Sequence, residues 1–222
     1  MNRQKGDGPL MVAIVTGGHT FDVPAFRDLW RDLPGVDAYV QSMEDWADDV
    51  AKVRDQYDVT VFYGMPIATP TGQEPWPARR NREALEALGA TTQGILVLHH
   101  AIVAYPEWSL WGEIVGVKDR RTTVAFNETM HVRIADPAHA ITASVAPFDI
   151  IDETYANLNP DASCHALLTT DHPKSMPVIA WTRAYREARV FCLQLGHDGQ
   201  AWRNDGFRTV LRRGIEWCAG RA

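Results

Sequence analysis

The stretch Leu10-Met11-Val12-Ala13-Ile14-Val15-Thr16, followed by Gly17-Gly18-His19, decides the fold of this chain. Its apolar, largely β-branched run ends at two glycines, which is typical of a buried strand in a parallel sheet. Strands of this kind are covered by helices on both faces of the sheet. The stretch therefore predicts an α/β protein whose first strand ends at the glycines.

The rest of the first hundred residues repeats this pattern. Further strands are predicted over residues 36–40, 58–63 and 94–98. Helices are predicted over residues 24–31, with Asp22 as a candidate N-cap, over 42–55 and over 75–88. Strands that alternate with helices are joined by right-handed crossovers and form a parallel sheet.

The second half of the sequence has a different pattern of predicted elements. A predicted helix over residues 107–115 is followed by strand-like segments over 122–134, 164–170 and 176–182, joined by turn-rich connections. We expect these segments to form an antiparallel extension or flap. A buried strand over 189–195 and a helix over 206–219 follow. The chain thus predicts one domain over residues 1–222, with a loose leader over residues 1–9.

Composition excludes several classes of function. The net charge of -6 and the pI of about 5.7 argue against a nucleic-acid-binding surface. No apolar run approaches the ~18 residues of a membrane span, and the polar start of the chain lacks the apolar core of a signal peptide. Three cysteines without paired spacing favour reduced thiols. We expect a cytoplasmic protein that binds neither nucleic acid nor membranes.

Histidines follow three of the predicted strands at the point where each strand ends. They are His19, the pair His99-His100, and His197. Ligands of open parallel sheets bind outside the carboxyl ends of the strands, and an imidazole there suits acid–base chemistry or metal ligation. We expect one member of the pair to face the cleft and the other to be a core residue bonded to the backbone. For His19, a plain turn is the alternative.

An acidic cluster, Asp152-Glu153-Thr154-Tyr155, follows the apolar residues 148–151. A carboxylate that enters the cleft could orient a histidine or act as a base. The alternative is the start of a helix or turn with exposed acids. We take the following residues as candidates for catalysis: His197, His99, His100 and Glu153.

The candidate substrate-binding residues are Gly18, His19, Tyr63, Trp108 and Asp198. They lie at or shortly after predicted strand ends, and an aromatic face such as that of Trp108 suits the stacking of a sugar ring. A divalent metal such as zinc, held by His19, His99 and His197, is an alternative to metal-free chemistry, although no metal-binding spacing motif is present. The turn at residues 99–101 carries neither Ser nor Cys, which disfavours covalent acyl transfer.

Four segments, in this order along the chain, resemble signature segments of the ThuA-like (trehalose utilisation) family. They are 94–101 (GILVLHHA), 132–142 (VRIADPAHAIT), 152–155 (DETY) and 195–198 (LGHD). The resemblance implies a flavodoxin-like fold of the class I glutamine amidotransferase type, a three-layer sandwich. Amidotransferases carry a nucleophilic Cys on the sharp turn after a strand and a histidine base later in the chain. Here His197 is similar to that histidine, while the turn holds His100 or Ala101.

The same resemblance implies a role in the breakdown of trehalose and related disaccharides through 3-keto sugar derivatives. We therefore expect an enzyme (an isomerase, lyase or hydrolase) that acts on a disaccharide or keto-sugar derivative by general acid–base catalysis, with or without a metal. A non-catalytic sugar-binding or regulatory protein, and an amidotransferase-like hydrolase without the Cys, are the alternatives. The expected partner is a small-molecule carbohydrate, and a homo-oligomer is compatible with the sequence.

Overall fold

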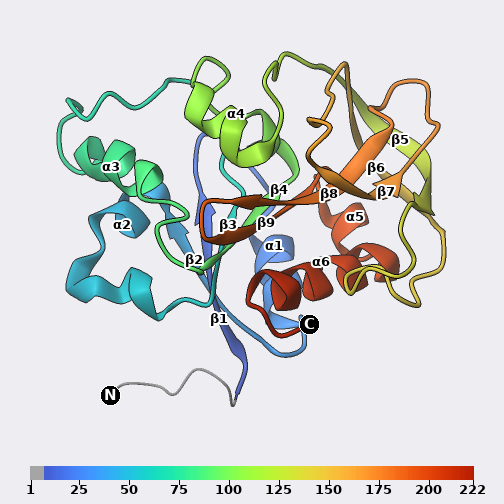
Figure 1. Cartoon of the computed structure of the whole chain (residues 1–222), viewed down its shortest axis with the longest axis horizontal. Helices are drawn as coiled ribbons and strands as arrows, with labels where there is room; N and C mark the ends of the chain where they lie inside the picture. Colours follow the sequence, from blue (N-terminus) through green and yellow to red (C-terminus); the bar gives the residue numbers. More distant parts are fainter. Residues whose placement is uncertain (1–7) are drawn as a thin grey trace.

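A nine-stranded mixed sheet organises the molecule (Figure 1). The computed structural model describes residues 8–222, so most of the leader expected over residues 1–9 lies outside the described residues. The strands are β1 (Leu10–Thr16), β2 (Val36–Ser42), β3 (Val59–Phe62), β4 (Gly94–Leu98), β5 (Thr123–Ile134), β6 (Phe148–Ala156), β7 (His165–Thr169), β8 (Val178–Tyr185) and β9 (Ala188–Leu193). The α-helices are α1 (Val23–Arg31), α2 (Met43–Asp48), α3 (Asn81–Glu86), α4 (Ser109–Val115), α5 (Gly199–Trp202) and α6 (Asp205–Cys218).

The parallel half of the sheet consists of β1 to β4 together with β9. Strand β1 pairs with β2 and β3, β3 pairs with β4, and β4 pairs with β9, all in parallel register. The resulting order, β2-β1-β3-β4-β9, is the flavodoxin-like order. The α/β class and the mostly parallel start of the sheet are thereby confirmed. Because the strands are parallel, the carboxyl ends of β1, β3, β4 and β9 meet at one edge.

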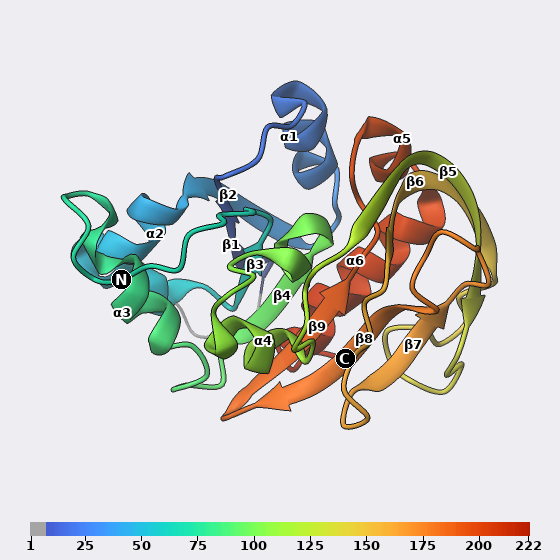
Figure 2. The same ribbon diagram turned by 90° about the horizontal axis from the view of Figure 1, so that it is seen from above.

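The antiparallel half extends the sheet beyond β9. Strand β8 pairs antiparallel with β9, β7 with β8, and β5 with both β7 and β6. Figure 2 shows β5 and β6 arching together as a long ribbon whose end approaches α5. The expected antiparallel extension is confirmed. One strand was not predicted: β6 includes the acidic cluster at residues 152–155, whose side chains are buried, so the interpretation as a helix or turn start with exposed acids is wrong.

Two predicted helices are shorter than expected. The helix expected over residues 42–55 begins at its Ser42 cap but ends at Asp48, because Asp49 adopts the left-handed conformation (φ 53°) and a 3₁₀ segment follows. The helix expected over 75–88 is reduced to one 3₁₀ turn and α3. Pro75 and Pro77 explain the loss, since proline lacks an amide hydrogen and disfavours helical geometry in the residue before it.

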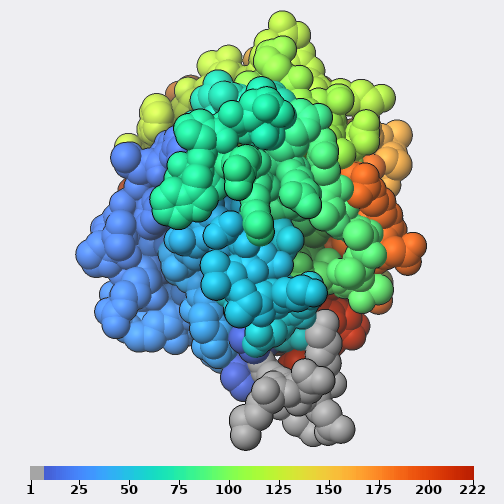
Figure 3. All heavy atoms as spheres, turned by 90° about the vertical axis from the view of Figure 1, so that its left-hand side faces the viewer, coloured from blue at the N-terminus to red at the C-terminus, as the bar shows by residue number. Residues whose placement is uncertain are grey.

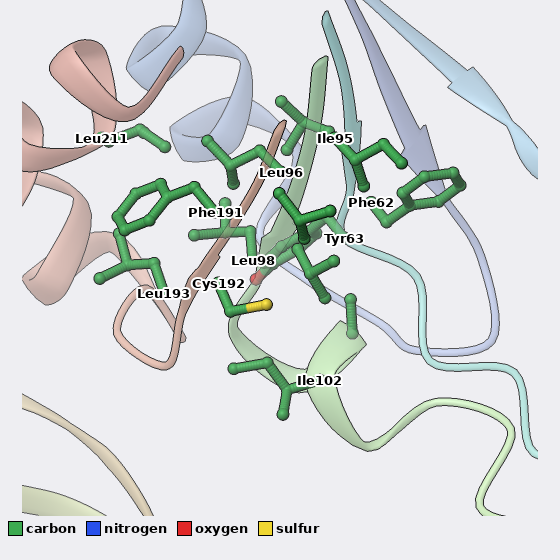
Figure 4. Packing of buried hydrophobic residues seen from close by; sticks show 14 of the residues in the cluster. Phe62, Tyr63, Ile95, Leu96, Leu98, Ile102, Phe191, Cys192, Leu193 and Leu211 are labelled. Atoms are coloured by element: carbon green, nitrogen blue, oxygen red, sulfur yellow. The ribbon is translucent and has the colours of Figure 1, made fainter. Parts of the chain in front are cut away.

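The helices pack on an apolar core centred on the parallel strands. Figure 4 shows Leu211 of α6 near Phe191 of β9 and Leu96 of β4, all of which are buried. Gly94 allows α6 to approach closely, because a Cβ at this position would lie 2.6 Å from Cβ of Cys218. On the opposite edge of the molecule, α2, α3 and the segments around them form much of the surface seen in Figure 3. Within residues 8–222, no helix has the length and apolar character needed to span a membrane.

Candidate functional site

The turn after β4 holds His99 in a strained conformation. Its φ of 54° lies in the left-handed region, which costs a non-glycine residue about 1–3 kcal/mol and is concentrated at functional sites. The side chain is completely buried. The residue at the strained turn is therefore His99, one position before the His100 or Ala101 that the amidotransferase resemblance implied.

A backbone contact determines where His99 carries its hydrogen. Its Nδ1 lies 2.6 Å from the carbonyl oxygen of Gln194, which can only accept, so Nδ1 is the donor. In the uncharged ring, Nε2 then presents a lone pair. Three polar atoms surround it: the hydroxyl of Tyr155 at 3.1 Å, Oε2 of Glu153 at 3.1 Å and Nδ1 of His197 at 3.2 Å. The buried imidazole is thus the centre of a polar cluster, the His99–Glu153–His197 cluster.

The carboxylate of this cluster comes from the antiparallel half. Glu153 on β6 contacts both His99 and His197 through Oε2, and its contact with Nδ1 of His197 is very short. Burial alone would raise the pKa of Glu153, but the hydrogen bond from His197 and the contact with His99 outweigh it and lower this pKa to about 2. The same hydrogen bond, which Glu153 accepts from Nδ1 of His197, raises the pKa of His197 above its ordinary value more than any other cause. Glu153 is therefore ionised at neutral pH and favours the protonated form of His197.

The turn that carries His197 is held in place by a second carboxylate. Asp152 accepts hydrogen bonds from the backbone N–H groups of Gly196 at 2.6 Å and of His197 at 3.0 Å. From the end of β3, the hydroxyl of Tyr63 donates to the carbonyl oxygen of His197 at 3.1 Å. The His197 side chain is 26% exposed, whereas that of His99 is 0% and that of Glu153 is 8% exposed. His197 is thus the member of the cluster that reaches solvent, and its Nε2 is available to a substrate because Nδ1 faces Glu153.

The other two strand-end histidines lie beside the cluster. His100 donates from Nε2 to the carbonyl oxygen of Tyr63, and burial lowers its pKa to about 2, which keeps the ring neutral. Both histidines of the pair are thus buried and bonded to the backbone, whereas only one was expected to be, and His99 differs in that its Nε2 faces the other members of the cluster. His19 stacks on His100 with ring centroids 4.3 Å apart and lies 6.3 Å from the ring of His197. The strand-end histidines thus gather at one edge of the sheet, as the parallel topology predicts.

Tyr63 and Asp198, two predicted substrate contacts, have structural partners. Tyr63 is buried and braces the turn at His197, as described above. Asp198 caps α5 by accepting a hydrogen bond from the N–H of Gln200 at 2.8 Å. Direct contact of either side chain with a substrate stays a prediction.

The two other predicted binding residues, Gly18 and Trp108, have neighbours outside the cluster. Gly18 is exposed, has a φ of 72°, and fits against residues 65–66, where a Cβ would come within 2.6 Å of the nitrogen of Pro66. Trp108 is buried against Tyr105, with ring centroids 5.5 Å apart. The indole thus packs in the core, and its role as a sugar platform stays a prediction.

Two residues of the site were missed by the sequence-based prediction. The hydroxyl of Tyr155 donates to Nε2 of the uncharged His99, and Asp152 supports the turn of His197. Both lie on β6, which was not predicted as a strand. Alternation along a strand places Tyr155 on the same face as Glu153, so recognition of β6 would have been the signal that finds Tyr155.

The cluster can hold a cation. Nε2 of His99, Oε2 of Glu153 and Nδ1 of His197 lie within 4.8 Å of one another. His19, which the sequence suggested as a ligand, is not a member of this group, and Glu153 is. Two imidazole nitrogens and one carboxylate oxygen suit zinc and similar divalent ions. Without a metal, a proton shared between His197 and Glu153 occupies the same place, so the arrangement is also that of an acid–base pair.

Comparisons with known proteins bear on the family and the fold. The family model ThuA, described as trehalose utilisation, matches residues 17–218. No curated protein sequence matches the chain. A ThuA-like protein from Parabacteroides merdae has a similar structure, with a TM-score of 0.72 and 18% identity, covering 95% of this chain and 90% of that one. A ThuA-like protein from Bacteroides uniformis has a TM-score of 0.67 and 15% identity, with 98% and 94% covered.

A more distant structural likeness is also found. A protein described as part of a GMP synthase, from Thermoplasma acidophilum, has a TM-score of 0.55 and 14% identity, covering 97% of this chain and 96% of that one. At such low identity these structures show a shared fold and nothing more. The family match, by contrast, runs from the glycine turn after β1 to the last turn of α6 and includes every residue of the cluster. The chain therefore belongs to the ThuA (trehalose utilisation) family.

Proposed function

We propose that the protein is an enzyme of carbohydrate breakdown that acts on a keto derivative of a disaccharide or glycoside. The observation that carries the proposal is the short contact between the buried carboxylate of Glu153 and Nδ1 of the partly exposed His197. A histidine held in this way has a defined tautomer and a more basic second nitrogen. The family description, trehalose utilisation, supports a carbohydrate substrate.

The reaction we propose is a proton transfer next to a ketone. Nε2 of neutral His197 takes a proton from the carbon beside the carbonyl group, and the electron pair of that C–H bond moves toward the carbonyl oxygen to form an enediolate. Glu153 stabilises the imidazolium that results. In isomerisation, the imidazolium returns the proton to the former carbonyl carbon while the hydroxyl proton of the adjacent carbon passes to the former carbonyl oxygen, which leaves the ketone at the adjacent carbon. In elimination, the enediolate re-forms the carbonyl group, a C=C bond forms to the carbon that carries the glycosidic oxygen, that C–O bond breaks, and the imidazolium gives its proton to the departing oxygen. Such positioned acid–base groups contribute ~10²–10⁴-fold to rate.

The test is turnover of 3-keto-glucosides by purified protein and by the His197→Ala variant. We expect the variant to lose ~10²–10⁴-fold in kcat/KM while its circular dichroism spectrum and thermal unfolding stay close to those of the unsubstituted protein. His131→Ala is the matched control, since His131 is an exposed histidine whose Nδ1 pairs with the exposed Asp149, away from the cluster. Full activity of His197→Ala would refute the proposal.

A metal-dependent form of the reaction is the second candidate. One observation favours it: Nε2 of His99 lies 3.1 Å from Oε2 of Glu153. Both atoms are acceptors when the imidazole of His99 is uncharged, and two facing acceptors are unfavourable without a cation between them. Nε2 of His99 lies 3.1 Å from Oε2 of Glu153 and 3.2 Å from Nδ1 of His197, separations that two ligands of one zinc ion could keep, whereas the very short contact between Glu153 and His197 would have to lengthen on binding. The hydrogen bond from Nδ1 to the backbone is the outer contact that metal-bound histidines commonly make. The residues present therefore fit a zinc-like ion, which would supply a Lewis acid for the carbonyl group.

Elemental analysis and Co²⁺ titration distinguish the two candidates. If the cluster binds a metal, one equivalent of Co²⁺ should give the visible absorption of a low-coordinate site, and His99→Ala should abolish it. If activity survives exhaustive chelation and no equivalent of metal is found, the metal-free reaction stands. Absence of turnover in both states, with sugar binding intact, would instead favour a non-catalytic sugar-binding protein.

A further inference from the structure

A β-bulge in β5 lies directly opposite Glu153. The pairing of β5 with β6 runs from Ala125 opposite Thr154 to Glu128 opposite Asp152. Two residues, Phe126 and Asn127, therefore face the single residue Glu153. Asn127 takes the left-handed conformation, with a φ of 55°, as the extra residue of the bulge. Bulges beside functional sites commonly redirect a side chain, and the side chain redirected here is that of Phe126.

Phe126 lies over the exposed side of the cluster. Its ring is 5.9 Å from that of His197, centroid to centroid, at an interplanar angle of 64°. Phe126 is nevertheless 62% exposed, more than its apolar ribbon neighbours Val124 at 38% and Ile151 at 42%. The cluster thus borders an exposed aromatic ring through His197, its partly exposed member. An exposed aromatic ring beside such a cluster offers an apolar face to a ligand that reaches His197.

The position of Phe126 is held by contacts to the turn that carries His197. The amide nitrogen of Gln200 donates to Oδ1 of Asn127 at 3.2 Å, and a carboxylate oxygen of Asp198 accepts from the backbone N–H of Gln200 at 2.8 Å. Asp198 directly follows His197 in the chain. The ring and the imidazole therefore belong to one connected unit that spans the ribbon and the end of β9.

This unit combines a flat apolar face with polar groups beside it. The ring of Phe126 supplies the face, and the side chains of Asn127, Gln200 and Asp198 supply amide and carboxylate groups next to it. A pyranose ring has the complementary form, since its C–H groups present an apolar face and its hydroxyl groups lie around the edge. A ring placed on Phe126 would bring one of its carbons within reach of His197.

We infer that Phe126 is the platform on which the protein binds the pyranose ring of its substrate, and that it determines specificity for glycosides over smaller keto compounds. The inference deepens the proposed function and rests on it for the identity of the reacting group. It predicts a loss of binding rather than of chemistry when the ring is removed, because Phe126 is not itself a donor or acceptor of protons.

The kinetic test compares Phe126→Ala with Phe126→Trp on a 3-keto-glucoside. A bound sugar would bury about half of the Phe126 side chain, and Phe126→Ala removes this contact. We therefore expect KM to rise ~5–10-fold in Phe126→Ala, while kcat stays within about twofold of that of the unsubstituted protein. The tryptophan variant, which keeps a flat apolar face, should stay within about twofold of the unsubstituted protein in both. The matched control is Val124→Ala, which shortens an apolar side chain on the same strand and should change neither constant. A fall in kcat without a change in KM would overturn the inference, since it would mean that Phe126 positions His197 instead of binding sugar.

A binding test separates this inference from the proposed function. Saturation-transfer NMR with trehalose and with methyl α-D-glucopyranoside reports sugar contact without turnover. We expect saturation of the C–H protons on one ring face, lost in Phe126→Ala and retained in Val124→Ala. Sugar binding that depends on Phe126, without turnover of any keto sugar, would refute the enzyme and leave the platform intact. Turnover that is equal in Phe126→Ala and the unsubstituted protein would refute the platform and leave the enzyme intact.

Discussion

The parallel half of the sheet and the antiparallel ribbon contribute different chemistry to the same site. The parallel strands deliver imidazoles, since His19, His99 and His197 follow β1, β4 and β9. The ribbon delivers the carboxylates and the aromatic ring, through Asp152 and Glu153 on β6 and Phe126 on β5. The site exists only where the two halves meet, so the reactivity of a histidine from one half depends on a residue of the other.

The variant with the largest expected loss of stability tests whether the ribbon supports the parallel half. Asp152→Ala should leave the backbone N–H groups of Glu153, Gly196 and His197 without their carboxylate acceptor. We expect the free energy of unfolding to fall by about 3–5 kcal/mol, because unpaired buried donors each cost about 1–3 kcal/mol. Chemical denaturation measures the change.

Asp149→Ala is the control for this variant. Asp149 lies on the same strand, but its side chain is 72% exposed and pairs with an exposed histidine. A surface substitution of this kind should change the unfolding free energy by less than about 0.5 kcal/mol. Equal effects of the two variants would show that the ribbon does not hold the turn after β9.

An intermediate effect is expected inside the parallel half, away from the ribbon. Gly94→Ala would place a Cβ 2.6 Å from the carbonyl oxygen and Cβ of Cys218, so that β4 and α6 must move apart. Overpacking of this kind costs about 1–3 kcal/mol. Thermal unfolding should show the loss, and Thr92→Ala, an exposed change two residues earlier, should not. If Gly94→Ala were as stable as the unsubstituted protein, the close approach of α6 to β4 would not be needed.

The variant with the smallest expected change in free energy tests most directly whether the ribbon controls a histidine of the parallel half. Replacement of Glu153 by Gln removes the negative charge that favours protonated His197, so the pKa of His197 should fall. The imidazole of His197 loses its positive charge as the pH rises through its pKa. The midpoint of its titration should therefore move to lower pH in the variant. NMR titration of the imidazole C–H protons, in the presence of a chelator, measures this midpoint. An unchanged midpoint would mean that the ribbon's carboxylate does not control the histidine that β9 delivers.

Much of the parallel half was predictable, because its elements are specified by local patterns. The run of residues 10–16 and that of 94–98 are apolar along almost their whole length, and both form strands with the expected bounds. The N-caps at Asp22 and Ser42 begin α1 and α2 as expected, since a side-chain oxygen three residues before a free amide acts locally. Where Asp49 turns left-handed, no local pattern predicted the end of α2.

The sequence was sufficient to place histidines at the carboxyl ends of buried parallel strands, because strand periodicity and glycine turns are properties of neighbouring residues. It was not sufficient to show which imidazole would meet which carboxylate. The pairing of His99 and His197 with Glu153 joins residues that are 54 and 44 positions apart, and it depends on how β5 and β6 fold back across the end of β9. Such long-range pairing follows from the packing of the whole sheet, and so the tautomer, the charge and the accessible face of each histidine became known only from the assembled fold.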